Sequence, residues 1–181
     1  MTGGDATGVQ PDGVADGFDE FVHRERAALV SLAWSLTGSF PAAEELAQEA
    51  LSAAWQTWGR IGAYDKPGAW ARRVVVNRAA NHRRRAGREA RALRRLAGHR
   101  SRPDPVRLPG DDLEVWEAVR ALPTRQAQAI ALHYLDDRSV DEVAHVLGCT
   151  PGSVKTHLHR GRVTLARALG FTGHDDEGAM R

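Results

Sequence analysis

The most informative stretch of the sequence is SVDEVAHVLGCTPGSVKTHLHRGR, residues 139–162. Ser139 is followed three residues later by Glu142, a capping-box pattern that predicts the start of a short helix. Gly148 is suited to end that helix in a left-handed conformation. Thr150 followed by Pro151 is typical of the first residues of another helix. Two helices joined by so short a turn form a helix-turn-helix.

The second helix of this unit has an apolar and a polar side. Val154, Leu158 and Gly161 recur at three- and four-residue steps, which predicts a buried stripe. The outward positions include residues that suit DNA: Ser153, Lys155, Thr156, His159 and Arg160. Arginine pairs with guanine edges, lysine with phosphates, and small hydroxyl side chains allow close approach. The pattern therefore predicts a helix that enters the major groove.

The same periodicity predicts helices through the rest of the chain. In the N-terminal half we expect helices over 18–36, 42–58 and 69–85, with a Gly- and Pro-containing loop at 59–68. In the C-terminal half we expect four helices within 111–169. The fold class is therefore all-α: two small helical domains, 18–85 and 112–170, joined by an Arg-rich linker, 86–111. Residues 1–17 are expected to be a disordered tail and 171–181 a polar one.

Charge is unevenly distributed along the chain. The net charge is only +2, but residues 72–107 carry 13 Arg against 2 acidic residues, whereas the flanking segments are net acidic. A strongly basic block in an otherwise acidic chain favours a polyanionic partner.

Several classes of protein are excluded by what the sequence lacks. Cys149 is the only cysteine, so neither an internal disulfide framework nor a Cys-rich zinc site is expected. His157 and His159 point to different faces of a helix and do not pair as metal ligands. No apolar run is long enough for a membrane span, and no signal peptide is visible, so a cytoplasmic protein without bound metal or cofactor is expected.

Three blocks in order resemble bacterial sigma factors of the extracytoplasmic-function (ECF, group IV) class, with some likeness to the SigE-type branch. They are AEELAQEALSAAW (43–55), PGAWARRVVVNRAANHRRR (67–85) and the helix-turn-helix. The resemblance covers about residues 18–170 and implies sigma region 2 followed by sigma region 4. It implies a transcription initiation factor, not an enzyme, that binds core RNA polymerase, recognises the −35 and −10 promoter elements and melts the −10 element. A separate anti-sigma protein is also expected.

The resemblance assigns roles to particular residues. Contact with the β′ clamp coiled coil of the polymerase falls on an acidic helical face: Glu44, Glu45, Leu46, Gln48 and Glu49. The family also places the β flap among its partners. Contact with the −10 element falls on Arg73 and Asn77, with Tyr64 as a candidate for stacking on a base and with Arg83, Arg84 and Arg85 on the backbone. Lys155, Thr156, His159 and Arg160 match the −35 contacts.

Two alternatives follow from the same residues. A helix-turn-helix regulator that works without polymerase would use 139–169, but it leaves the acidic helix and the block at 69–85 unexplained. A recombinase or nuclease would need a nucleophile with convergent arginines or a carboxylate metal cluster, and neither pattern is visible. The linker either connects the two domains passively or binds the template strand or nascent RNA through its arginines.

Overall fold

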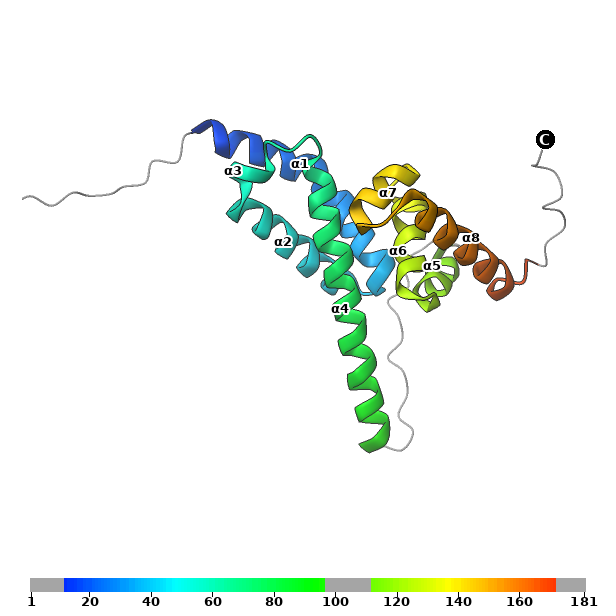
Figure 1. Cartoon of the computed structure of the whole chain (residues 1–181). Coiled ribbons are helices and arrows are strands. Elements are labelled where there is room, and N and C mark those ends of the chain that lie inside the picture. Colours follow the sequence, from blue (N-terminus) through cyan, green and yellow to red (C-terminus); the bar gives the residue numbers. More distant parts are fainter. Residues whose placement is uncertain (1–11, 97–111, 172–181) are drawn as a thin grey trace, which may run out of the picture.

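The computed structural model describes residues 12–96 and 112–171, and over these residues it contains helices and no strand. The N-terminal domain consists of α1 (Asp12–Thr37), α2 (Phe40–Gln56), α3 (Trp58–Ile61) and α4 (Pro67–Leu96). The C-terminal domain consists of α5 (Asp112–Ala121), α6 (Thr124–Ile130), the π-helical segment η1 (Ala131–Leu135), α7 (Val140–Leu147) and α8 (Pro151–Ala168). The expected all-α, two-domain architecture is confirmed (Figure 1).

The N-terminal domain is a bundle of α1, α2 and α4 around one apolar core. Gly38 ends α1 with a φ of 72°, a conformation that glycine adopts without strain. The Ser39 side chain then accepts a hydrogen bond from the Ala42 backbone N–H and caps α2. Leu32 of α1, Ala50 of α2 and Val75 of α4 are fully buried. Burial of such apolar area is the main force that holds the three helices together.

The C-terminal domain follows the local signals of its sequence. The Ser139 hydroxyl accepts from the Glu142 backbone N–H at 3.3 Å, and the Glu142 carboxylate accepts from the Ser139 backbone N–H at 3.0 Å, which completes the capping box. Gly148 ends α7 in the left-handed conformation, with a φ of 63°. Thr150 caps α8 through the Ser153 N–H at 3.2 Å. The predicted helix-turn-helix is therefore present from cap to cap.

Glycine also lets α8 approach α6 closely. A Cβ atom at Gly161 would lie 3.0 Å from Cγ1 of Ile130, closer than side chains normally pack. Val154 and Leu158, on the same stripe of α8, are buried. The stripe predicted for this helix is therefore its packing face, and its opposite side is left to solvent.

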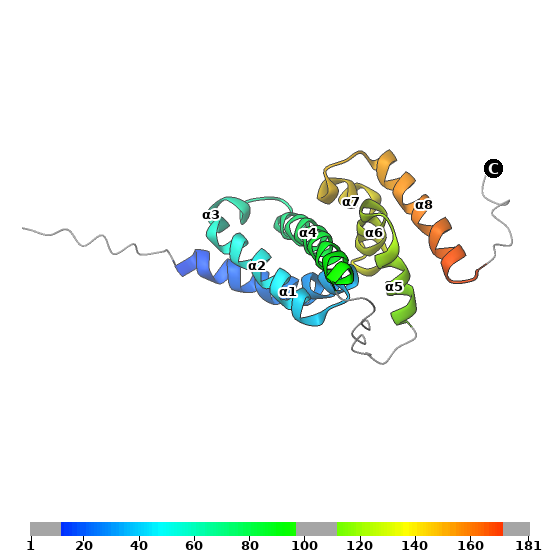
Figure 2. The same ribbon diagram turned by 90° about the horizontal axis from the view of Figure 1, so that it is seen from below.

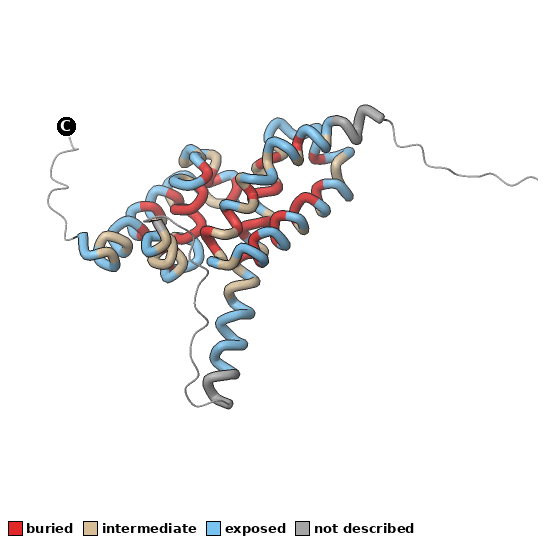
Figure 3. Tube along the Cα trace, turned by 180° about the vertical axis from the view of Figure 1, so that it is seen from behind, coloured by how far each residue is buried: buried red, intermediate tan, exposed pale blue. Residues whose placement is uncertain are grey.

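Three boundaries differ from the sequence-based prediction. Helix α1 begins at Asp12 rather than near Phe18. The predicted loop at 59–68 overlaps the short α3, where Trp58 packs its ring against Phe18 and Phe21. Helix α4 continues to Leu96, so the first part of the predicted linker is helical and projects from the body (Figures 1 and 3). Residues 1–11, 97–111 and 172–181 lie outside the described part of the chain, and 97–111 is the rest of the predicted linker.

The two domains pack against each other along α4. Figure 2 shows α4 between α1 and α2 on one side and α6 and α7 on the other. Gln128 of α6, buried, donates from Nε2 to the Val76 carbonyl of α4 at 2.9 Å. This arrangement brings the helix-turn-helix against the helix that the resemblance assigns to the −10 element.

Candidate nucleic-acid interface

Helix α8 presents an exposed polar face with basic residues. Lys155, Thr156, His159 and Arg160 are all exposed, and Ser153 is partly exposed because it packs against the N-terminal cap. The face stands on the buried stripe of Val154 and Leu158, which fixes its orientation relative to α6 and α7. All five side chains predicted to contact the −35 element therefore lie along the outer side of one helix.

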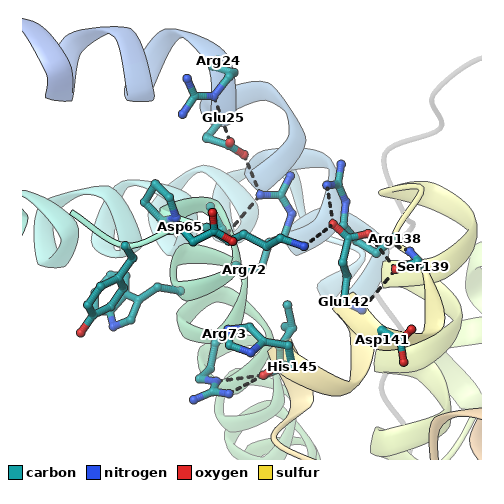
Figure 4. A pocket seen from close by; sticks show the side chains of 17 residues that line it. Arg24, Glu25, Asp65, Arg72, Arg73, Arg138, Ser139, Asp141, Glu142 and His145 are labelled. Atoms are coloured by element: carbon teal, nitrogen blue, oxygen red, sulfur yellow. Dashed lines mark hydrogen bonds and ion pairs between the residues drawn. The ribbon is translucent and has the colours of Figure 1, made fainter. Parts of the chain in front are cut away.

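The residues predicted to contact the −10 element occupy different environments. Asn77 is exposed, and Tyr64 in the loop before α4 is 44% exposed. The Arg73 side chain points to α7, where it donates from Nε to the Val146 carbonyl at 3.0 Å and from Nη2 to the His145 carbonyl (Figure 4). Asn77, Tyr64 and Arg73 are all exposed, but the Nε and Nη2 donors of Arg73 are already engaged with α7.

The three consecutive arginines of α4 also lie in different environments. Arg83 is half-buried and donates from Nη2 to the Arg120 carbonyl at the end of α5, and burial lowers the pKa of its guanidinium. Arg84 donates to the Asn81 side chain and, like Arg85, is exposed. Arg84, Arg88 and Arg91 recur at four- and three-residue steps, so they continue the helix side that carries Arg73 and Asn77.

Arg72 was not predicted as a functional residue, yet it is the most deeply buried cation of this region. Its guanidinium forms a two-point contact with Asp136, from Nε to Oδ2 and from Nη2 to Oδ1 at 3.0 Å. Nη1 donates to the Glu25 carboxylate at 2.6 Å and to the Gly68 carbonyl at 3.2 Å. The residue is 5% exposed, and Asp136 is 8% exposed. A signal was available, because Arg72 falls three residues before Val75 and seven before Ala79, on a buried stripe of α4 where a charge needs partners.

The pKa shifts of this cluster agree with its geometry. Burial alone would raise the pKa of Glu25, but the hydrogen bond and positive charge of Arg72 outweigh it and hold the pKa below its usual range. Burial alone would lower the pKa of Arg72, but the carboxylates of Asp136 and Glu25 outweigh it and raise the pKa. Both groups are therefore charged over the ordinary pH range.

A cleft of about 1140 Å³ adjoins this cluster, between the two domains. It is lined from the N-terminal domain by residues that include Arg24, Glu25 and Tyr64, and from the C-terminal domain by residues that include Arg138 and Glu142 (Figure 4). Lys66 lies 3.7 Å from the Glu142 carboxylate across it. Within the described ranges, no group of three or more His, Cys, Asp and Glu side chains is placed to hold a metal ion.

The acidic residues assigned to the polymerase lie on α2. Glu44, Glu45 and Gln48 are exposed, whereas Glu49 is partly exposed and pairs with Arg78 of α4. Leu46 is 7% exposed and belongs to the core of the domain, so it supports this face from beneath. The exposed surface of α2 is therefore acidic and polar, and Leu46 does not contribute to it.

None of the helices in the described part of the chain is long and apolar enough to cross a membrane.

Comparison with protein families gives two matches. The family model for sigma-70 region 2 matches residues 21–89, and the family model for sigma-70 region 4 matches residues 112–165. The ECF RNA polymerase sigma factor SigL of Mycobacterium tuberculosis is 32% identical over 159 residues, which cover 81% of this chain and 86% of SigL. SigW of Bacillus subtilis is 27% identical and covers 87% of this chain and 91% of SigW.

A solved structure supports the same assignment. The sigma factor RpoE from Bartonella quintana, in complex with the anti-sigma factor NepR, superposes with a TM-score of 0.68 at 25% identity, over 86% of this chain and 98% of that one. Two region models in the expected order, a relative above 30% identity and a shared fold agree with one another. The chain belongs to the ECF family of RNA polymerase sigma factors.

Proposed function

We propose that this sigma factor contacts the −35 element with the outer face of α8. The observation that carries the proposal is that Lys155, Thr156, His159 and Arg160 are exposed together on a helix whose opposite stripe is buried. Arg160 supplies a two-donor fork suited to a guanine edge, and Lys155 supplies a charge suited to a phosphate. The N-terminus of α8, with Ser153 in its first turn, adds backbone donors for a phosphate.

We propose that the −10 element is bound by α4 and by the loop before it. Asn77 offers an amide that can pair with a base edge, and Tyr64 offers a ring on which an unstacked base can lie. Arg73 joins them once its side chain is free of α7. Arg83, Arg84 and Arg85 lie further along the same helix and suit the phosphate backbone. Capture of an unstacked base lowers the free energy needed to melt the duplex.

Core polymerase is proposed to bind the exposed acidic residues of α2. Glu44, Glu45 and Gln48 offer a negatively charged surface for the β′ clamp coiled coil, with Glu49 beside them and Leu46 beneath. Charge complementarity of this kind speeds association and sets the register of docking. We propose the β flap as the second polymerase contact, made by region 4.

The remaining proposals follow from membership of the family. The protein acts in the cytoplasm as a non-enzymatic subunit, and the polymerase supplies the chemistry. A separate anti-sigma protein binds it, as NepR binds the related RpoE. A regulator that works without polymerase is less well supported, because it gives no role to the acidic face of α2 or to Asn77 and Tyr64.

The test is transcription by purified bacterial core RNA polymerase on a pooled promoter library, with and without this protein. Discrete transcripts that require the protein are expected, and the sequences upstream of them would give both promoter elements. The variant Arg160→Ala should lose transcripts selectively, whereas Thr164→Ala, an exposed change one helical turn further along α8, should not. Absence of both transcripts and association with core polymerase would reject the proposal.

A further inference from the structure

The C-terminal part of α4 projects from the rest of the molecule. From Arg84 to Ala92 every residue is exposed, and the helix leaves the body of the protein along this stretch (Figures 1 and 3). The family model for region 2 ends at residue 89 and the model for region 4 begins at residue 112, so the last turns of α4, up to Leu96, lie beyond both. Membership of the family therefore assigns no role to this end of the helix.

Three arginines of the projecting segment lie on one side of it. Arg84, Arg88 and Arg91, here called the arginine row, follow one another at steps of four and three residues. Asn77, seven residues before Arg84, lies on the same side. Glu89, the only acidic residue between 81 and 96, precedes Arg91 by two residues and so faces another way. The side of α4 proposed to bind the −10 element therefore continues as a row of positive charges.

The charges of the arginine row are not neutralised by the described part of the protein. Arg78, on another side of α4, pairs with Glu49 of α2. No carboxylate that the structure describes pairs with Arg84, Arg88 or Arg91. Like charges one turn apart on a helix repel one another and cost stability. A polyanion bound to the row would offset this repulsion, so the row is suited to phosphate groups.

The composition of the segment favours double-stranded over single-stranded nucleic acid. Proteins that hold single strands combine positive charge with aromatic side chains on which unstacked bases lie. Tyr64, before the start of α4, provides such a ring and is 44% exposed, whereas residues 81–96 contain no Phe, Tyr or Trp. The arginine row therefore offers charge without a stacking surface, as contact with the backbone of a duplex requires.

The length of the arginine row matches several phosphates of one strand. Arg84 and Arg91 are seven residues apart in the sequence, which corresponds to about 10 Å along a helix. One strand of B-DNA advances by about 3.4 Å per phosphate, so the row spans about three phosphates. Each phosphate that a cation neutralises contributes about 0.9 to the slope of log K against log salt. Arg88 and Arg91 together should account for about 1.8 of that slope.

The order of the chain indicates which part of the promoter the row meets. Helix α4 runs from the side of Tyr64, where the melted base is proposed to bind, to Leu96, and the chain then continues to region 4. The −35 element, assigned to region 4, lies upstream of the −10 element. The projecting end of α4 is therefore expected on the upstream side, where the promoter is still a duplex.

We propose that the arginine row is a third promoter contact, which holds the phosphates of the duplex immediately upstream of the −10 element. The contact would add affinity without reading the base sequence, because it reaches only the backbone. The proposal rests on the function assigned to α4 above.

The first test measures the salt dependence of duplex binding by the full-length protein. The probe is a short DNA duplex of random sequence, and binding is followed by fluorescence anisotropy. Replacement of both Arg88 and Arg91 by alanine should lower the slope of log K against log salt by about 1.8 and weaken binding at least tenfold at physiological salt. Binding to single-stranded RNA of random sequence should change less. Alanine is the best helix former, and circular dichroism checks that the helix persists.

A variant with rearranged charges provides the matched control. Ala86→Arg, Arg88→Ala, Ala90→Arg and Arg91→Ala together keep the composition and the net charge, and they move two cations to the side of α4 that carries the buried Ala79. A straight duplex laid along that side would meet the body of the protein. The rearranged variant should therefore not recover the slope of the native protein.

The second test locates the contact in the complex of core RNA polymerase, this protein and a promoter recovered from the library. Cys149, the only cysteine, is replaced by serine, and an iron chelate that generates hydroxyl radicals is attached to Ala92→Cys, an exposed position beside the arginine row. Cleavage is expected in the duplex between the two promoter elements. The same chelate on Thr164→Cys of α8, also exposed, should cleave near the −35 element instead.

The outcomes separate this proposal from the proposed function. An unchanged slope in the double alanine variant, full recovery in the rearranged variant, or an equal or larger loss of RNA binding would overturn the contact with duplex DNA. Cleavage from Ala92→Cys in the transcript or in the melted strands would also overturn it. Failure of the native protein to support transcription, together with the expected change of slope, would reject the function and leave a duplex-binding surface on α4.

Discussion

Replacement of Arg72 by alanine should destabilise the protein far more than replacement of Arg78 on the same helix. Arg72→Ala removes the cation that binds both Glu25 and Asp136, whose side chains are 13% and 4% exposed, and leaves them only the more exposed Arg24 and Arg138. Removal of one partner from a buried ion pair costs about 3–5 kcal/mol. Because Arg24 stays beside Glu25 and Arg138 stays beside Asp136, we expect the lower end, about 3 kcal/mol. Arg78→Ala breaks a pair with Glu49 in which both side chains are 41% exposed, and such pairs contribute about 0–1 kcal/mol.

Thermal unfolding followed by circular dichroism measures this difference. At about 2–4 °C per kcal/mol for a chain of this size, Arg72→Ala should lower Tm by about 6–12 °C, and Arg78→Ala by no more than about 4 °C. Arg72 holds the pKa of Glu25 below its ordinary value of 4.5, so the stability that this pair contributes is present above pH 4.5 and is lost as the pH falls through the folded-state pKa. The deficit of Arg72→Ala should therefore shrink in acid. Equal losses in the two variants, or a deficit that does not change with pH, would refute the reasoning.

Four further outcomes are expected. Arg160→Ala should weaken binding to duplexes that contain the −35 element by about 1–3 kcal/mol and relax specificity at one base pair, and a uniform loss on all duplexes would contradict a base contact. Asn77→Ala should spare duplex binding and reduce promoter melting, measured by permanganate reactivity. Ser139→Ala should cost about 1 kcal/mol of stability at neutral pH. This loss should be smaller below pH 4.5, since hydrogen bonds from Ser139 keep the pKa of Glu142 below that value. Arg88→Glu with Arg91→Glu should flatten the salt dependence of promoter binding, and an unchanged slope would show that these arginines do not contact phosphate.

The sequence alone predicts the helix-turn-helix in detail because its signals are local. Ser139 and Glu142 satisfy backbone groups within one turn, Gly148 needs only its own freedom of φ, and Thr150 caps the helix that Pro151 begins. No distant residue is required for any of these choices. The buried stripe of α8 is equally local, since its three- and four-residue spacing alone defines one side of the helix.

The interdomain interface could not be predicted in this way. Arg72 and Asp136 are 64 residues apart, and neither stands in a motif that identifies the other. A buried position for Arg72 can be inferred from Val75 and Ala79 on the same stripe, but its partner cannot. Helix α3 could not be predicted either, because it also depends on residues distant in the sequence. Packing of Trp58 on Phe18 and Phe21 stabilises this turn of helix in a segment rich in glycine.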